Sequence, residues 1–209
     1  CSRDWSSDVC SSDLIGERKH TNSFLAGVTQ VLTPDDVVQA NLGYTRGRGY
    51  FSDPYKTIDN RPRSRDQRTL VLAWNHYVAS AQAALRSSYR LYDDSWGVQS
   101  HTFGVEWQQA VAPTVSLTPS LRYTTQRAAS FYYGPDYDST YGAPFPAGYQ
   151  FGSSAYLSPD QRLSAFGGIT AGLKAEWRVN AALSVDVALD RYEQRGNWRL
   201  GGKIGRAHV

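Results

Sequence analysis

The sequence is poor in several features that other folds of this size depend on. Its only cysteines, Cys1 and Cys10, lie at the extreme amino end, so the rest of the chain offers no disulfide and no cysteine-based metal site. No apolar run approaches the length of a membrane helix, and mean hydropathy is −0.49, which excludes a helical membrane protein. The net charge of +3 is small and dispersed, and it does not favour nucleic acid as a partner.

The short motifs that carry enzyme chemistry are also missing. There is no Gly-x-Ser-x-Gly and no His-Glu-x-x-His, and Gly47 and Gly49 precede no predicted helix that could hold a phosphate. We therefore expect no enzyme, no catalytic residue, no cofactor and no metal. One alternative stays open, in which His101, close in sequence to Asp93, Asp94 and Ser95, forms a hydrolase triad at the outer rim of the fold.

What the sequence does contain is a repeated two-residue alternation. Apolar side chains recur at every second position of 38–44, 115–123 and 183–189, with mostly polar residues between them. Because alternate side chains on a β-strand point to opposite faces, each segment has one apolar and one polar face. Segments of about ten such residues, joined alternately by tight turns and long loops, are typical of outer-membrane β-barrels.

The alternation predicts eight strands, at roughly 20–32, 36–48, 67–78, 81–92, 98–110, 115–127, 161–178 and 183–194. Short turns at 33–35, 79–80, 112–114 and 180–182 alternate with connections at 49–66, 93–97 and 128–160. We predict an all-β fold, an antiparallel up-and-down transmembrane β-barrel of the bacterial outer membrane, with the short turns in the periplasm. The alternative is a soluble carbohydrate-binding β-sandwich. Pro119 falls inside a predicted strand, where we expect a bulge.

The predicted strands do not include a terminal strand that ends in an aromatic residue. Eight strands can close a small barrel. Without such a terminal strand, we expect residues 15–203 to be a fragment of a larger barrel.

The two ends of the sequence read as non-native. One set of codons for residues 8–13, GACGTGTGCTCTTCCGAT, has a reverse complement that translates as Ile-Gly-Arg-Ala-His-Val, the sequence of residues 204–209. The shared string resembles a short-read sequencing adapter. We therefore expect residues 1–14 and 204–209 to be adapter-like segments and leave them out of the fold prediction. Both cysteines fall in this part, and the absence of a signal peptide says nothing against secretion.

Three stretches, 47–62, 92–98 and 121–132, carry a resemblance to a known family. They contain Gly-Arg-Gly-Tyr-Phe-Ser-Asp-Pro-Tyr-Lys followed by Asp-Asn-Arg-Pro, then Tyr-Asp-Asp-Ser-Trp-Gly-Val, then Leu-Arg-Tyr followed by Ala-Ala-Ser-Phe-Tyr. In these motifs the chain resembles an uncharacterised bacterial family known as domain of unknown function 3570, whose members are predicted outer-membrane β-barrels. The resemblance covers most of 18–203. It implies the barrel and no established activity.

Strand parity gathers charged side chains on the polar, inward face. Because isolated buried charges are costly, we favour a paired network that fills or narrows the lumen over an arginine ladder that guides anionic solutes. The predicted lumen-lining residues are Arg86, Arg90, Arg122, Arg162, Lys174, Glu176, Asp186 and Asp190.

Two loops supply candidate contacts on the outer side. The loop at 50–66 is rich in Asp, Arg and Lys, and we favour a loop pinned by its own ion pairs over a ligand-recognising gate. The loop at 131–156 is rich in tyrosine, and we favour a packed loop over a sugar platform or a calcium site. The candidate outer-loop contacts are Asp53, Tyr55, Lys56, Asp59, Arg61, Trp96, Tyr132 and Tyr133. The expected partners are outer-membrane lipid and an unidentified small solute, and the choice between a pore and a structural barrel stays open.

Overall fold

The structure, a computed structural model, describes residues 16–56, 58–134 and 154–200, and within them the chain forms eight β-strands and no α-helix. The strands are β1 (Lys19–Thr33), β2 (Asp36–Gly49), β3 (Ser64–Val78), β4 (Ala83–Asp94), β5 (Gln99–Ala112), β6 (Val115–Arg127), β7 (Phe166–Arg178) and β8 (Ser184–Arg195). Three short 3-10 turns complete the regular structure, at Ala79–Ala81, Gln161–Leu163 and Gly196–Trp198. None of the described helical turns is long and apolar enough to span a membrane.

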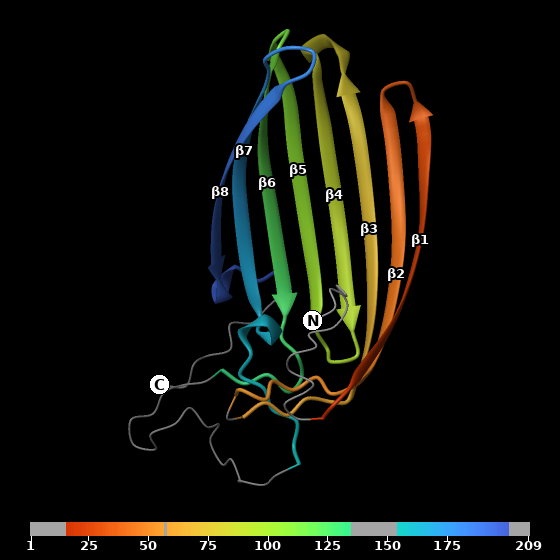
Figure 1. The fold of residues 1–209 in the computed structure, drawn as a ribbon, viewed down its shortest axis with the longest axis vertical. Coiled ribbons are helices and arrows are strands. Elements are labelled where there is room, and N and C mark those ends of the chain that lie inside the picture. Colours follow the sequence, from red (N-terminus) through yellow and green to blue (C-terminus); the bar gives the residue numbers. More distant parts are fainter. Residues whose placement is uncertain (1–15, 57, 135–153, 201–209) are drawn as a thin grey trace.

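Each strand pairs with its neighbour in sequence to give one eight-stranded sheet in the order β1 to β8 (Figure 1). Every pairing is antiparallel. The sheet is not closed, since β1 and β8 form its two edges. The predicted all-β, up-and-down architecture is confirmed. The β-sandwich alternative is wrong, because a sandwich needs two sheets packed face to face and the described chain forms one.

The connections alternate as the sequence predicts. Short turns join β1 to β2, β3 to β4, β5 to β6 and β7 to β8 at one end of the sheet, and the long connections after β2 and β6 lie with the compact one after β4 at the other end (Figure 1). We call these the turn end and the loop end. The predicted limits agree with the observed ones to within three residues for every strand except β7. This strand begins at Phe166, whereas the prediction places its start at 161.

The bulge that we expect at Pro119 is absent. Pro119 pairs with Leu173 of β7, and the register between β5 and β6 is the same on both sides of Pro119. The pairing with β5 is only interrupted there, because proline has no N–H to donate. The register shifts observed in the sheet lie elsewhere, at 31–33 in β1 and at 110–112 in β5.

Local side-chain hydrogen bonds explain the short turns. In the turn before β8, the Asn180 side-chain oxygen accepts from the backbone N–H groups of Ala182 (2.8 Å) and Leu183 (3.0 Å), which closes an Asx-type bend. In the turn before β2, the Thr33 hydroxyl donates to the Asp36 carboxylate at 2.7 Å. The Asn180 bonds satisfy backbone groups that the tight turn would otherwise leave unpaired, and the Thr33–Asp36 bond joins the two side chains that flank its turn.

The register sorts the side chains into two faces. On the convex face, one cross-strand row runs from Ala40 through Leu72, Tyr89, Phe103 and Tyr123 to Ile169. The neighbouring row on the concave face runs from Asn41 through Val71, Arg90, Thr102 and Thr124 to Gly168. The convex face exposes many large apolar side chains, among them Phe24, Val28, Leu42, Leu72, Trp74, Phe103, Leu121, Leu173, Trp177 and Leu189.

A small hydrophobic core lies at the loop end and not within the sheet. It consists of the buried residues Trp96, Val98, Ala129, Phe131 and Leu163, with Phe51, Tyr92 and Tyr132 packed against it. The core therefore joins the connections after β2, β4 and β6 into one packed unit. It fixes the loops over the sheet and positions the site described next.

Candidate functional site

The structure places the charged side chains of the predicted lumen on one face. Strand pairing brings seven of the eight to the concave face, namely Arg86, Arg90, Arg122, Lys174, Glu176, Asp186 and Asp190. The direct cross-strand partners include Glu176 opposite Asp186 and Arg122 opposite Thr170.

The eighth residue, Arg162, does not lie on a strand. It belongs to the 3-10 turn Gln161–Leu163, before β7 begins. Parity within a strand therefore says nothing about Arg162, and its guanidinium instead binds Asp160 at the loop end, with Nη2 and Oδ2 2.7 Å apart. The error comes from the predicted start of the strand, because residues 162–165 continue the alternation of polar and apolar side chains without joining the sheet.

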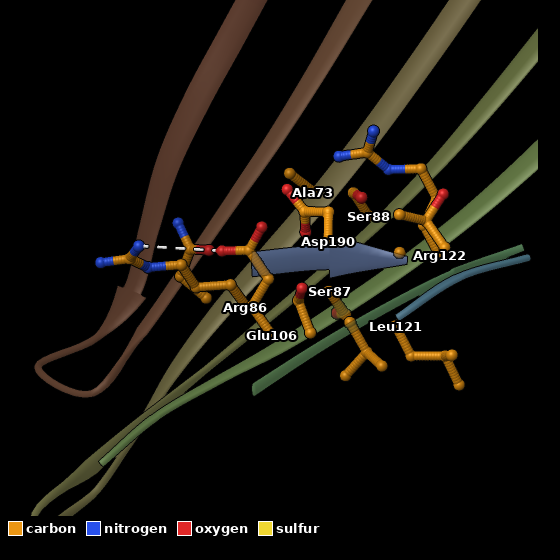
Figure 2. A pocket seen from close by; sticks show the side chains of 13 residues that line it. Ala73, Arg86, Ser87, Ser88, Glu106, Leu121, Arg122 and Asp190 are labelled. Carbon is orange, nitrogen blue, oxygen red and sulfur yellow. Dashed lines mark ion pairs between the residues drawn. The ribbon is translucent and has the colours of Figure 1, made fainter. Parts of the chain in front are cut away.

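A hollow of about 290 Å³ lies on the concave face, and it brings together side chains from β3 to β8 (Figure 2). Arg86 and Glu106 form an ion pair at its wall, with Nη1 and Oε2 4.0 Å apart. Two glycines, Gly104 and Gly172, leave the space for this hollow. A Cβ on Gly104 would lie 2.8 Å from the Ser88 hydroxyl, and a Cβ on Gly172 would lie 2.5 Å from the Ser120 hydroxyl.

The concave charges are only partly paired. Lys174 contacts Glu176 at 3.4 Å, and Arg90 lies over the ring of Tyr92, with 5.6 Å between the guanidinium carbon and the ring centroid. Within the described ranges, Arg122 and Asp190 have no hydrogen-bond or ion-pair partner, although both line the hollow. These two groups are therefore free to contact a solute or water.

At the loop end, the connection after β2 is clamped to the connection after β6. Arg61 donates from Nε to Asp59 and from Nη2 to Asp160, both at 2.8 Å. Lys56 lies 3.5 Å from the same Asp160 carboxylate. The backbones of Asn60 and Leu157 form an antiparallel bridge. We call this loop pair the roof, defined as residues 50–63 and 154–165.

Asp160 is the electrostatic centre of the roof. The side-chain hydrogen bond from Arg162 holds the pKa of Asp160 well below its ordinary value, and further hydrogen bonds from the Arg162 backbone and from Arg61 outweigh the opposing effect of burial. Burial, with the nearby Asp160 charge, raises the pKa of the Tyr132 phenol. The ionised Asp160 therefore ties three cationic side chains from two loops together.

Asp94 is the second buried carboxylate of the loop end. It accepts from Nε and Nη2 of Arg65, from the Tyr92 hydroxyl, and from the backbone N–H groups of Trp96 and Val98. Arg65 in turn lies flat against Trp96, with the guanidinium carbon 4.2 Å from the ring centroid. The tight bend that allows this uses a positive φ of 86° at Gly97. Asp94 thus organises the connection between β4 and β5.

A cavity of about 660 Å³ lies between the roof and the concave face. Its floor comes from the concave residues at the loop ends of β1 to β3, among them Lys19 and Gln67, and its sides come from Phe51, Tyr55 and Asp160. Charged, hydroxyl and aromatic groups line it together. It lies at the loop end of the concave face.

The structure separates the predicted outer contacts into two groups. Trp96 and Asp59 are buried, and Arg61 is nearly so, and these three serve the packing of the roof. Asp53, Tyr55 and Lys56 remain accessible, and Tyr55 is 75% exposed. Tyr132 packs against the core, and the Tyr133 backbone donates to Ser158. Of the other tyrosines in that loop, Tyr156 is exposed, and those between 135 and 153 lie outside the described residues.

Sequence reasoning left several charged residues of the site out of the predicted lumen, among them Glu106, Lys19, Asp94 and Asp160. Glu106 lies on the concave face opposite Arg86 and Ser120, where the parity of β5 could have identified it. Lys19 and Asp94 could have been placed in the same way from the parity of β1 and β4. Asp160 lies outside the strands, so its role depends on contacts that parity does not predict.

The proposed hydrolase residues are not assembled. His101 lies on the convex face with Nδ1 2.7 Å from the Tyr89 hydroxyl, and Asp94 is held by Arg65. In the described part of the chain, no group of three or more His, Cys, Asp and Glu side chains is placed to hold a metal ion.

Comparison with known proteins gives a family and a fold. The model of a family described as "Protein of unknown function (DUF3570)" matches residues 4–209. No curated protein matches the sequence. Among solved structures, the fold is similar to OmpTdeltaL8, a loop L8 deletion mutant of OmpT, an outer membrane protein of Vibrio cholerae, with a TM-score of 0.53 and 12% identity. The match covers 84% of this chain and 49% of the other, so the chain spans about half the length of that protein.

Proposed function

The chain belongs to the DUF3570 family of proteins of unknown function. On this basis and on the geometry above, we propose that it forms part of the wall of a bacterial outer-membrane β-barrel. The concave face of the sheet then lines a solute path. The observation that carries this proposal is the division of one sheet into an apolar convex face and a charged concave face. A soluble sheet would cover its apolar face with other elements, whereas a barrel presents it to lipid.

Tryptophan placement supports a membrane position for the sheet. Trp74, Trp107 and Trp177 lie on the convex face in the turn-end halves of β3, β5 and β7. The Trp74 indole N–H donates to Asp36 at 2.9 Å, so its ring combines an apolar body with a satisfied polar tip. Aromatic side chains of this kind concentrate where a barrel meets the membrane interface.

The open edges of the sheet add one requirement. Within the described ranges β1 and β8 each pair with one strand only, and backbone groups cannot remain unpaired in lipid. We therefore include further strands in the proposal, which close the barrel together with these eight. The roof then covers the outer entrance of the lumen.

The charges of the concave face suggest which solutes would pass. Cationic groups outnumber carboxylates on this face: Lys19, Arg65, Arg86, Arg90, Arg122, Lys174 and Arg178 against Asp94, Glu106, Glu176, Asp186 and Asp190. A lumen with a surplus of one sign concentrates the opposite ion. The proposed solutes are therefore small anions.

Planar-bilayer recording on the full-length protein tests the proposal. We expect stepwise conductance with anion selectivity at neutral pH. The selectivity should fall in Arg122→Glu, because Arg122 faces the hollow and has no ion-pair partner among the described residues. Arg63→Glu is the matched control, since Arg63 lies in the loop region and pairs with Glu17. Cation selectivity of the wild type would overturn the anion path, and failure to insert into bilayers would overturn the barrel itself.

A further inference from the structure

The convex face is not uniformly apolar, and its charges are distributed unevenly along the strands. At the loop end of β2 and β3 it carries Arg46, Arg48 and Arg68 around the carboxylate of Asp66, and Asp93 of β4 lies opposite Arg68. Over the turn-end half of the same face, the described strands carry no lysine or arginine. We call Arg46, Arg48, Arg68 and Asp66 the arginine patch.

Only one arginine of the patch is neutralised at short range. Arg48 forms two hydrogen bonds with Asp66, from Nη1 at 2.9 Å and from Nη2 at 3.3 Å. Arg46 approaches the same carboxylate no closer than 3.9 Å, and its side chain is 58% exposed. Arg68 is exposed and has no hydrogen-bond or ion-pair partner within the described residues. The three guanidinium groups of the patch therefore outnumber the two nearby carboxylates, Asp66 and Asp93, and Arg46 and Arg68 remain accessible.

The position of the patch along the strand is that of a lipid head group. Arg46 lies ten residues beyond Asp36, where β2 begins. A tilted membrane strand needs about 9–11 residues to cross the hydrocarbon core, so Arg46 falls where the strand leaves it. Directly below the patch on the same face lie Tyr44 and Leu42, both exposed and able to contact acyl chains.

We propose that Arg46 and Arg68 bind the phosphate of an anionic membrane lipid whose acyl chains lie along Leu42 and Tyr44. This proposal rests on the barrel proposed above, because it needs the convex face to be in lipid. Charge complementarity supports it, since guanidinium groups match phosphate oxygens in geometry and charge. The apolar surface beneath the patch favours a lipid over a free phosphate ion.

The test uses the full-length protein in non-ionic detergent, titrated with phosphatidylglycerol, with thermal unfolding followed by tryptophan fluorescence. We expect phosphatidylglycerol to raise the unfolding temperature of the wild type more than phosphatidylcholine does. The double variant Arg46→Gln with Arg68→Gln should need about 25-fold more phosphatidylglycerol for the same shift, at about fivefold for each arginine. Arg90→Gln on the concave face is the matched control and should behave like the wild type.

Two further measurements separate the outcomes. If the double variant does not fold, the single variant Arg68→Gln replaces it in the titration, because Arg68 forms no ion pair among the described residues that the fold would lose. Inorganic phosphate at the same ionic strength should give no comparable shift in the unfolding temperature, and an equal shift would show a free-phosphate site and overturn the lipid site.

Insertion into phosphatidylcholine vesicles is measured separately. If the wild type inserts but the double variant and Arg90→Gln respond alike, the lipid site is wrong and the barrel stands. If the wild type does not insert, the barrel fails.

Discussion

The Arg61 guanidinium donates to the Asp160 carboxylate, with Nη2 and Oδ2 2.8 Å apart, across 99 positions of sequence. This contact joins the connection after β2 to the connection after β6, while β4 and β5 lie between them in the sheet. The two loops therefore lie across the end of the concave face and do not project independently into solvent. We therefore expect access to the proposed lumen to depend on this contact.

Removal of the Asp160 carboxylate should open the roof. Asp160→Ala leaves Arg61, whose side chain is 9% exposed, with Asp59 alone, and we expect the roof to lose about 1–3 kcal/mol of local stability. Protease added to intact cells that produce the full-length protein should then cut within 50–63 much faster than in the wild type. Glu17→Ala is the control, because it breaks only the exposed Arg63–Glu17 pair, which solvent screens. Equal cleavage of the two variants would contradict the clamp.

The roof should be insensitive to pH over the ordinary range. The pKa of Asp160 is lowered, so its contribution to stability is fully present above the ordinary carboxyl pKa of about 3.9 and is lost only as pH falls through the lower folded value. We therefore expect the protease sensitivity of 50–63 to be the same at pH 7 and pH 5, assayed with a protease active at both. An increase in cleavage at pH 5 would mean that another group controls the roof.

Asp94 should be more important for folding than its neighbour in sequence. Asp94→Ala leaves Arg65 stacked on Trp96 without its counter-charge and removes the acceptor for two backbone N–H groups, so we expect a loss of about 3–5 kcal/mol in the free energy of unfolding. Asp93→Ala should change it little, because Asp93 lies on the convex face opposite Arg68. Urea unfolding of the full-length protein in lipid vesicles measures both, and similar losses would refute the role of Asp94.

The same added charge should destabilise the fold more on the convex face of the sheet than on the concave face. Leu121→Arg places a guanidinium on the convex face near the middle of β6 and should cost about 2–4 kcal/mol in lipid. Ser120→Arg places it on the concave face opposite Glu106 and beside Gly172, where a carboxylate and space are available, and should cost much less. Refolding into lipid vesicles compares them, and equal costs would mean that the convex face does not contact lipid.

The strands, their order and their two faces can be predicted from the amino-acid sequence alone. Alternation has a period of two residues, so it can be read from any strand, and short turns such as the one closed by Asn180 are specified by side chains a few residues away. For this reason Arg86, Arg122 and Asp190 could be assigned to one face before the structure was known. The same local rule failed where the alternation continued beyond the sheet, as at Arg162, and where a proline interrupted the pairing without a bulge, as at Pro119.

The contacts between the loops depend on the tertiary structure and cannot be predicted from the local sequence. Nothing near Asp160 in sequence indicates that Arg61 and Lys56 will contact it, and nothing near Trp96 indicates that Phe51 and Phe131 will bury it. These contacts form because the sheet brings the ends of distant strands to one side, where aromatic rings leave water together and opposite charges pair. The pairing of residues far apart in sequence depends on that arrangement, and no local pattern encodes it.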